Sequence, residues 1–349
     1  MKDQPLISVM ILCFNYGHML PKALQACAGQ SFRDFEIVMI NNGSSDCTEE
    51  VYRDFCAKHP DLSTTYVPVY PNEGPVHGWN IGIQHAKGVY VMFNDADDWM
   101  EPDCLEKLAE QAERTDADRI VGPYQEVGED GTVLRVRGFL PNSPELPTAM
   151  LQGSMFRRSV VIENRLVIPE KPYYPGYDAW FVLNYASREK HCALVHGGAV
   201  YNYFFNPSSL ITKEINKKDF RSEFSGQRIS VPFITANAMK TAGEKERLKH
   251  QMEYLAIRHY YSNVVHCFMC YSKKDAMDYY ALLHREMKEL LPRYQKNPHL
   301  RPFRNQYEQP GSLVCWGLKW MERIHMMRFV RFLVTAAGRL LKRSELLRR

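Results

Sequence analysis

Short apolar runs alternate with amphipathic segments over the first half of the chain. Runs such as residues 6–14 are apolar on both faces, as the strands of a parallel sheet are. The predicted strands are residues 6–14, 36–40, 64–69, 89–93 and 119–121, with a hairpin turn at residues 129–131. The predicted helices are residues 20–28, 46–59, 79–86 and 102–114. This alternation predicts an α/β domain with a mixed, mostly parallel sheet flanked by helices.

The pattern changes at about residue 215, where glycine becomes sparse and charged residues become more frequent. Long helical patterns follow at residues 244–271 and 274–291. We therefore expect an α/β domain over residues 1–214 and a helical C-terminal region over residues 215–349. The C-x-x-C sequence at residues 267–270 has no second pair, so we interpret it as part of a core and not as a zinc or redox site.

Polar residues follow three of the predicted strands. Asn15 follows the first strand, Asn42 and Asp46 follow the second, and Asp95 and Asp97 follow the fourth. Because the carboxyl ends of parallel strands meet at one edge of a sheet, these side chains are expected to form one site. An exposed, acidic turn is the alternative, but closely spaced carboxylates repel one another unless a cation or a donor network compensates.

Two acids one residue apart at a strand end suit a hard divalent cation. Mg²⁺ and Mn²⁺ take few carboxylates and complete their shell with water and phosphate oxygens. The chain has no GxxxxGK[ST] loop and no GxGxxG after its first strand, which excludes P-loop chemistry and argues against a dinucleotide site. Asn42 and Asp46 have a structural alternative as turn former and helix cap, with Glu49 completing a capping box. Asp98 is expected to act as a cap or to orient the loop, and not to bind the metal.

Composition and cysteine usage limit the classes of protein to which this chain can belong. The chain has 349 residues, 45% of them hydrophobic, enough for a large core. Its nine cysteines are odd in number and lack a disulfide framework, so we expect a reduced, cytoplasmic setting. Residues 6–14 fit a buried strand better than a signal peptide. No uninterrupted apolar stretch reaches the roughly 18 residues that a membrane span needs.

The basic character of the chain belongs to its tail. Residues 316–349 contain nine Lys/Arg and two Asp/Glu, a net charge of +7, so the other 315 residues carry 4 − 7 = −3. A general nucleic-acid surface is therefore not expected. A helical projection places one group of residues on an apolar face: Phe329, Val330, Leu333, Ala337 and Leu340. The opposite face is basic: Arg328, Arg331, Arg339 and Lys342. This pattern predicts either an interfacial helix on an anionic membrane or a helix docked on the protein with solvated basic residues.

Two segments carry a family resemblance. They read ISVMILCFNYGHMLPKALQACAGQSFRDFEIVMINNGSSDCTEE and NEGPVHGWNIGIQHAKGVYVMFNDADDWMEPDCL. The ordered N-G-S-x-D, N-x-G and D-x-D motifs resemble family 2 glycosyltransferases of the GT-A fold, over roughly residues 6–210. The resemblance implies transfer of a sugar from a nucleotide diphosphate donor to a hydroxyl acceptor, usually with inversion. It also implies a nucleotide-sugar half over residues 1–100 and an acceptor half over residues 101–214.

The resemblance implies roles for particular residues. Nucleotide contacts are implied for Asn15, Asn42 and Asp46, and Asn80 is implied to line the donor site. Asp95 and Asp97 correspond to the D-x-D that holds Mg²⁺ or Mn²⁺ on the donor diphosphate, with Asp97 as the direct ligand and Asp95 also contacting ribose or sugar. We expect a UDP-sugar donor and a cell-surface glycan or lipid-linked saccharide as acceptor. We also expect a cytoplasmic location with peripheral contact to the inner face of the cell membrane.

The chain departs from the family pattern at four places. Asn41-Asn42 replaces a pair of acids, Trp79 replaces an arginine, Phe204-Phe205-Asn206 replaces an arginine and histidine, and Pro175-Gly176 stands where an acid pair supplies the base.

We therefore assign the general base to Asp178, two residues beyond Gly176. The alternative is that Asp178 caps a helix that begins at Ala179, and Glu170 is the next nearest acid.

Other residues and classes stay open. His196 is either a third metal ligand or structural. Tyr173, Tyr174 and Tyr177 either line a sugar subsite or belong to the core. Two alternative functions are an aspartate-dependent phosphotransferase and a non-catalytic protein that binds sugar nucleotides or carbohydrates.

Overall fold

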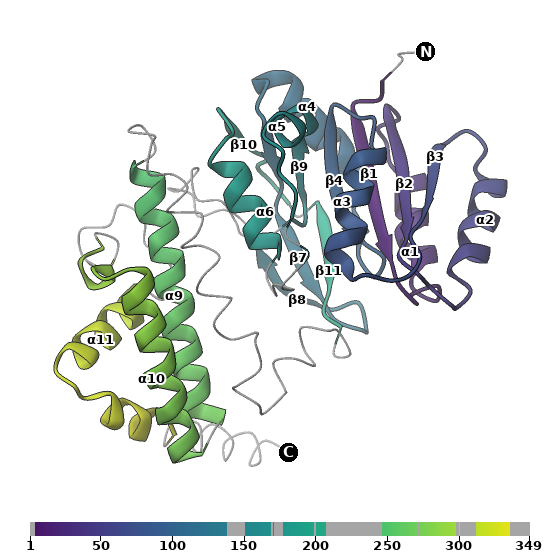
Figure 1. Cartoon of the computed structure of the whole chain (residues 1–349). Coiled ribbons are helices and arrows are strands. Elements are labelled where there is room, and N and C mark those ends of the chain that lie inside the picture. Colours follow the sequence, from purple (N-terminus) through teal and green to yellow (C-terminus); the bar gives the residue numbers. More distant parts are fainter. Residues whose placement is uncertain are drawn as a thin grey trace. The chain divides into compact units, whose positions relative to one another are not determined.

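The structure of the chain is a computed structural model that divides into two compact units (Figure 1). The first unit comprises residues 1–173 and 177–207, and the second comprises residues 174–176 and 208–349. The structure describes residues 4–137, 151–168, 170, 177–198, 200–206, 246–270, 272–297, 300 and 312–335.

A seven-stranded sheet forms the centre of the first unit, in the order β10-β6-β9-β4-β1-β2-β3 (Figure 1). Its strands are β1 Ile7–Cys13, β2 Phe35–Asn41, β3 Ser63–Pro68, β4 Tyr90–Asp95, β6 Arg119–Val121, β9 Ser154–Arg157 and β10 Cys192–Leu194. Every residue of β1 and β2 is buried, as expected for strands covered on both faces. All neighbouring pairs are parallel except those of β9, which runs antiparallel between β4 and β6. The predicted mixed, mostly parallel sheet is confirmed.

Helices cover both faces of this sheet. One face packs against α1 Leu20–Ala28, α2 Thr48–Lys58 and α4 Cys104–Thr115, and the other against α3 Pro75–His85, α5 Arg158–Glu163 and α6 Tyr177–Ala186. Alternate residues of β1 enter the two cores, with Ile11 on the first face and Met10 on the second. On the second face the rings of Phe93 and Phe181 meet edge to face at 5.0 Å.

Four strands that follow β4 in the chain form a second sheet. It has the order β5-β11-β7-β8, with β5 Trp99–Met100, β7 Tyr124–Val127, β8 Val133–Arg137 and β11 Tyr201–Phe204. The predicted turn at residues 129–131 is confirmed, since β7 and β8 form an antiparallel pair around it. β11 pairs with β5, which begins one residue after Asp98, and this pairing brings residues 201–206 to the acidic segment.

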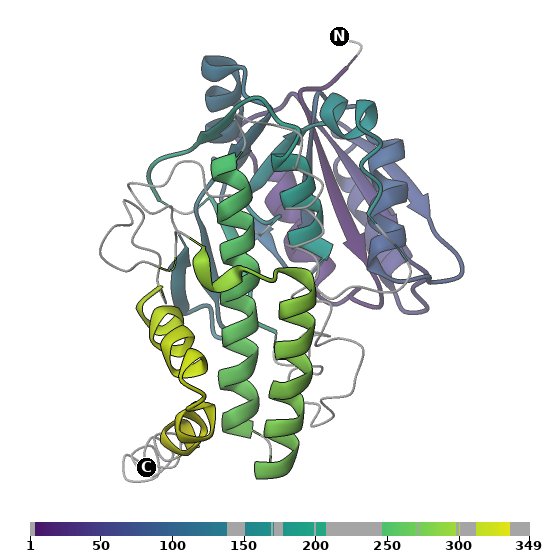
Figure 2. The same cartoon turned by 60° about the vertical axis from the view of Figure 1, so that its left-hand side comes forward.

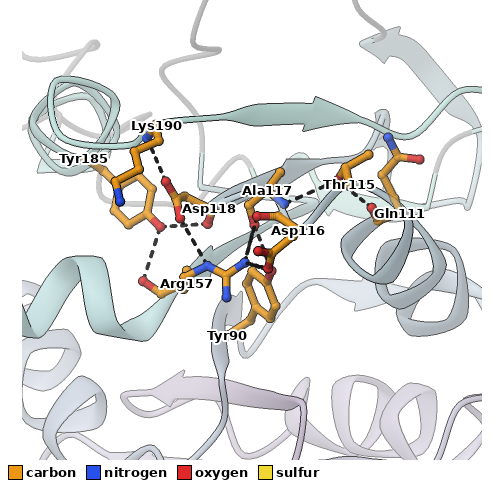
Figure 3. Close-up of polar contacts among 9 residues, drawn as sticks. All are labelled: Tyr90, Gln111, Thr115, Asp116, Ala117, Asp118, Arg157, Tyr185 and Lys190. Carbon is orange, nitrogen blue, oxygen red and sulfur yellow. Dashed lines mark hydrogen bonds and ion pairs between the residues drawn. The ribbon is translucent and has the colours of Figure 1, made fainter.

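A polar network holds α6 on the sheet (Figure 3). Arg157 of β9 contacts Asp116 at 2.5 Å and Asp118 at 3.1 Å. The Tyr185 hydroxyl of α6 donates to the backbone oxygen of Asp118 at 2.7 Å, and the backbone N–H of Lys190 donates to the Asp118 carboxylate at 2.7 Å. Because these contacts join α6 to β6 and β9, they set the position of the helix whose first turn carries Asp178.

The second unit, described by itself, is helical. Its elements are α9 Glu246–Cys270, α10 Lys273–Leu290, the short 3₁₀ helix Tyr294–Lys296 and α11 Ser312–Arg323, and residues 327–335 are also helical. α9 and α10 lie side by side in both views (Figures 1 and 2). The predicted helices at residues 244–271 and 274–291 are confirmed. Cys267 is buried in this unit's core, as expected.

No helix among the described residues is both long enough and apolar enough to cross a bilayer.

Candidate active site

The segments after β1, β2 and β4 leave the sheet at one edge. β1 lies between the other two strands and is parallel to both, with Leu12 opposite Asp95 and Cys13 opposite Asn41. The carboxyl ends of the three strands are therefore neighbours. The structure brings the predicted residues Asn15, Asn42 and Asp95 to this common edge, as the strand pattern predicts.

Asn15 joins the first two loops. Its backbone adopts the left-handed region with φ of 55°, which asparagine tolerates better than most residues. Its side-chain Oδ1 accepts a hydrogen bond from the Ser45 N–H at 2.8 Å, and its own N–H donates to the Ser44 hydroxyl at 3.0 Å. The loop after β1 is thereby held against the loop after β2.

Asp46 joins the same two loops from the other side. Its carboxylate accepts from the backbone N–H of Gly17 at 2.9 Å and from that of Thr48 at 3.1 Å. Burial alone raises the pKa of Asp46, but the hydrogen bonds from Thr48 and Gly17 outweigh it and lower the pKa. The predicted capping box is wrong, because the N-cap of α2 is Cys47 and Glu49 pairs with Arg53 at 2.8 Å.

Asn42 and Asn80 are both buried, but they differ in their hydrogen bonds. Asn42 is buried, and its Nδ2 donates to the Gly74 carbonyl at 3.0 Å. In the described part of the chain its Oδ1 is buried without a hydrogen-bond partner.

Asn80 is bonded within the fold. Its Oδ1 accepts from the Ile168 N–H at 3.0 Å, and its Nδ2 donates to Ile168 O at 2.9 Å and to Glu170 at 3.1 Å. This amide therefore ties α3 to Ile168 and Glu170, and its implied contact with a donor remains a prediction.

Asp95 and Asp97 stand at the end of β4. Gln152 donates to Asp95 Oδ2 at 3.3 Å, and Asn206 donates to Asp97 Oδ2 at 3.3 Å. Burial, followed by the Asp97 and Asp178 carboxylates, raises the pKa of Asp95 to about 8. Burial also raises the pKa of Asp97. Negative charge in this place is therefore costly unless a cation or a positively polarised ligand offsets it.

Asp98 has a different environment from its two neighbours. It is buried, and it accepts hydrogen bonds from the Tyr201 hydroxyl at 2.9 Å and from the Phe204 N–H at 2.8 Å. Burial and then the Asp95 and Asp97 carboxylates hold the pKa of Asp98 well above its usual value. These bonds attach the acidic loop to β11, which confirms the orienting role expected for this side chain.

Asp178 lies in the first turn of α6, which begins at Tyr177. The alternative in which it caps a helix beginning at Ala179 is therefore wrong. Its Oδ1 is buried and has no hydrogen-bond partner among the described residues. Burial raises the pKa of Asp178 to about 7. A carboxylate with this proton affinity, close enough to raise the pKa of Asp95, is suited to accept a proton near neutral pH.

Sequence patterns missed two residues of this site. Gln152 precedes β9 and belongs to no motif, so no local signal points to it. Tyr16 accepts a hydrogen bond at 2.7 Å from Asn206, the residue that also contacts Asp97. Asn206 itself lies within the stretch that departs from the family pattern.

The donor set fits a divalent cation. Asp95 and Asp97 present two carboxylates whose charges a cation would offset, and Mg²⁺ or Mn²⁺ completes such a pair with water and phosphate oxygens. No group of three His, Cys, Asp or Glu ligands forms around Asp97 in the described part of the chain. His196 is exposed in the loop after β10. The remaining candidates, Tyr173, Tyr174 and the Pro175-Gly176 pair, lie outside the described residues.

The mixed, mostly parallel sheet with acidic side chains at its carboxyl edge has the GT-A architecture. Residues 8–164 match the model of the family described as Glycosyl transferase family 2. A glycosyltransferase of Haemophilus influenzae is 27% identical over 164 residues, which cover 47% of this chain and 64% of that protein. The matches span less than two thirds of the length of the first curated relatives.

Solved structures show the same fold. S. aureus TarS residues 1–349 in complex with UDP-GlcNAc has a TM-score of 0.70 at 17% identity, covering 96% of this chain and 92% of that one. The mannosyltransferase PcManGT from Pyrobaculum calidifontis, in complex with GDP-Man and Mn²⁺, has a TM-score of 0.56 at 18% identity, covering 97% and 88%.

Proposed function

We propose that this protein is an inverting, metal-dependent glycosyltransferase. It transfers a sugar from a nucleotide diphosphate donor, with UDP-sugars favoured, to a hydroxyl of a cell-surface glycan or lipid-linked saccharide. The observation that carries the proposal is the convergence of Asp95, Asp97 and Asp178 at one edge of a family 2 domain. Asp95 is the last residue of β4, Asp97 lies in the turn that follows, and Asp178 comes from α6 more than eighty residues later.

The donor half of the site uses the loops after β1 and β2. Asn15, Asn42 and Asp46 contact the nucleotide. The Asn42 Oδ1, which has no hydrogen-bond partner among the described residues, can accept a hydrogen bond from it. Asp95 contacts ribose or sugar, and Asp97 would hold Mg²⁺ or Mn²⁺. A cation held there would supply positive charge beside the departing diphosphate.

Asp178 acts as the general base. Its carboxylate takes the proton of the acceptor hydroxyl while that oxygen forms a bond to the anomeric carbon. The bond between the anomeric carbon and the diphosphate oxygen breaks at the same time, and the electron pair leaves with the nucleoside diphosphate. Attack on the face opposite the leaving group inverts the anomeric centre.

Structural neighbours support a nucleotide-sugar donor. TarS is described in complex with UDP-GlcNAc, and PcManGT in complex with GDP-Man and Mn²⁺. These neighbours bind different nucleotides on one fold, so the fold alone does not determine the nucleobase of the donor. Both UDP- and GDP-sugars therefore belong in the test. We place the enzyme in the cytoplasm, with peripheral contact to the inner face of the membrane where lipid-linked acceptors lie.

A thermal-shift panel with UDP-, GDP-, CMP- and dTDP-sugars, each with and without Mn²⁺, tests donor binding. We expect stabilisation by one nucleotide class only when Mn²⁺ is present. Release of nucleoside diphosphate from that donor, measured with a mixture of saccharide acceptors, then tests transfer. Binding without hydrolysis or transfer would contradict the enzymatic proposal, and binding that is unchanged by EDTA would contradict the role of the metal.

A further inference from the structure

Exposed apolar side chains concentrate in one short part of the second unit. Among the described residues, six large ones fall within residues 320–333, and we call them the apolar stripe. They are Trp320 (43% exposed), Ile324 (54%), Met326 (39%), Phe329 (45%), Phe332 (63%) and Leu333 (48%). So many exposed apolar side chains in fourteen residues indicate an interaction surface, because single exposed apolar residues are normal but clusters are not.

The helical segment of residues 327–335 has a separate face for packing inside its own unit. Met327 and Val330 are buried in the core formed with α9 and α10, and Val334 packs against it. The predicted single apolar face is therefore wrong, since Val330 points inward while Phe329 and Leu333 remain exposed. The stripe is thus additional to the residues that the fold needs.

A buried carboxylate anchors the element that precedes this segment. Glu322 of α11 is buried and receives hydrogen bonds from several side chains of α9, α10 and the 3₁₀ helix. The donors are Tyr260, Tyr261 at 3.1 Å, Tyr280 at 3.1 Å, Tyr294, Gln295 at 3.1 Å and His284 at 3.0 Å. This network holds α11 in one rotation about its axis, with Trp320 and Ile324 exposed.

The turn between α9 and α10 extends the same surface. The Thr335 hydroxyl donates to the Phe268 carbonyl at 3.2 Å, so the end of the 327–335 segment lies at the C-terminal end of α9. There Met269 is 53% exposed, and Lys273 and Lys274 are exposed at the start of α10. The first turn of α10 also carries Asp275, which accepts a hydrogen bond from the Ser272 hydroxyl at 2.7 Å.

Within residues 316–335 every charged side chain except the buried Glu322 is cationic. The cations are Lys319, Arg323, Arg328 and Arg331. Arg323 lies over the Trp320 ring at 5.4 Å, which places a cation beside an exposed aromatic side chain. Exposed aromatic and aliphatic side chains bordered by cations are typical of surfaces that enter the headgroup region of an anionic bilayer.

We propose that the apolar stripe binds the surface of a membrane rich in anionic phospholipid, with the flanking lysines and arginines on the lipid phosphates. A second copy of the chain fits less well, because a two-fold interface would bring the same arginines of both copies together. Only the role of this surface rests on the proposed function: membrane binding would hold the enzyme where lipid-linked acceptors lie.

Co-sedimentation of the full chain with vesicles tests this. We expect binding to vesicles of phosphatidylglycerol and phosphatidylcholine but not to phosphatidylcholine alone, and weaker binding as salt rises above about 0.1 M. The triple variant Phe329→Ser, Phe332→Ser and Leu333→Ser should lower the partition coefficient by about 100-fold, since it removes three exposed apolar groups. The double variant Arg323→Gln and Arg328→Gln should weaken binding and reduce its salt dependence.

A matched control uses exposed apolar residues of the first unit. Val133→Ser, Leu134→Ser and Val136→Ser alter side chains that are 48–59% exposed, and should leave vesicle binding unchanged. Equal binding by the stripe variant and the wild type would overturn the inference. The inference would also be overturned if the wild-type protein did not bind vesicles but formed a dimer, and the stripe variant was monomeric.

Release of nucleoside diphosphate in the presence of the saccharide acceptors, measured without vesicles, separates the two proposals. Release without vesicle binding rejects only the membrane surface, and vesicle binding without release rejects only the enzymatic function.

Discussion

Asp178→Asn should make the protein more stable and less active at the same pH. Asparagine keeps the size of the side chain but can neither ionise nor accept a proton from the acceptor. The Asp178 Oδ1 is buried and has no hydrogen-bond partner among the described residues. Burial raises the pKa of this carboxyl from 3.8 to about 7. The folded state therefore opposes the charge that the proposed reaction needs.

The stability effect has a defined sign and pH window. Below pH 3.8 the carboxyl is protonated in both folded and unfolded chains, and its ionisation costs the fold nothing. Between 3.8 and about 7 the unfolded chain ionises first, so stability falls as pH rises, and the loss levels off above 7. At about 1.4 kcal/mol per pH unit the limit is about 4 kcal/mol. Because the residue as a whole is only partly buried, although its carboxyl Oδ1 is buried, we expect about 2 kcal/mol.

The activity effect runs in the opposite direction. Loss of a general base lowers transfer by about 10²–10⁴-fold. In the wild type, kcat/KM should fall about tenfold per pH unit below pH 7, where Asp178 becomes protonated, whereas the variant should lack this limb.

Calorimetry at pH 8 and pH 4, together with transfer assays across the same range, measures both effects. The control is Asp61→Asn, an exposed aspartate between α2 and β3, which should change neither. A variant that transfers sugar at the wild-type rate, or that unfolds at a lower temperature at pH 8, would refute the assignment. Glu170 would then be the next acid to test, although it already contacts His77 at 3.1 Å.

Three further variants test other parts of the structure. Asp97→Asn should abolish stabilisation by a donor with Mn²⁺ in a thermal-shift assay, and normal turnover in EDTA would contradict it. Glu322→Gln should destabilise the second unit by about 3 kcal/mol at pH 7, measured by urea unfolding. Hydrogen bonds to Glu322 outweigh its burial and lower its pKa from 4.5 to about 2. The stabilisation by the ionised carboxylate disappears as pH falls from 4.5 toward 2. Gly43→Ala should cost about 1–2 kcal/mol, because φ is +80° and a Cβ would lie 2.8 Å from Asn72 N; an unchanged unfolding midpoint would contradict this.

Sequence patterns predicted most of the first sheet and the long C-terminal helices. Strands apolar on both faces and helices with periodic apolar residues are recognised within a few residues of chain, so β1, β2 and α1 fall close to their predicted bounds. The short strand β9 was not predicted. It has only four residues, and its place between β4 and β6 depends on strands distant in sequence.

The same division holds for the candidate site. The sequence alone determined that acids and amides follow β1, β2 and β4, because each lies directly after an apolar run and parallel strands share an edge. Tertiary structure decided which distant groups join them. Gln152 reaches Asp95 across 57 residues and Asn206 reaches Asp97 across 109, through strand pairings that local pattern does not contain. Tertiary structure also separated Val330 from Phe329, since only packing against α9 and α10 determines which apolar face becomes core.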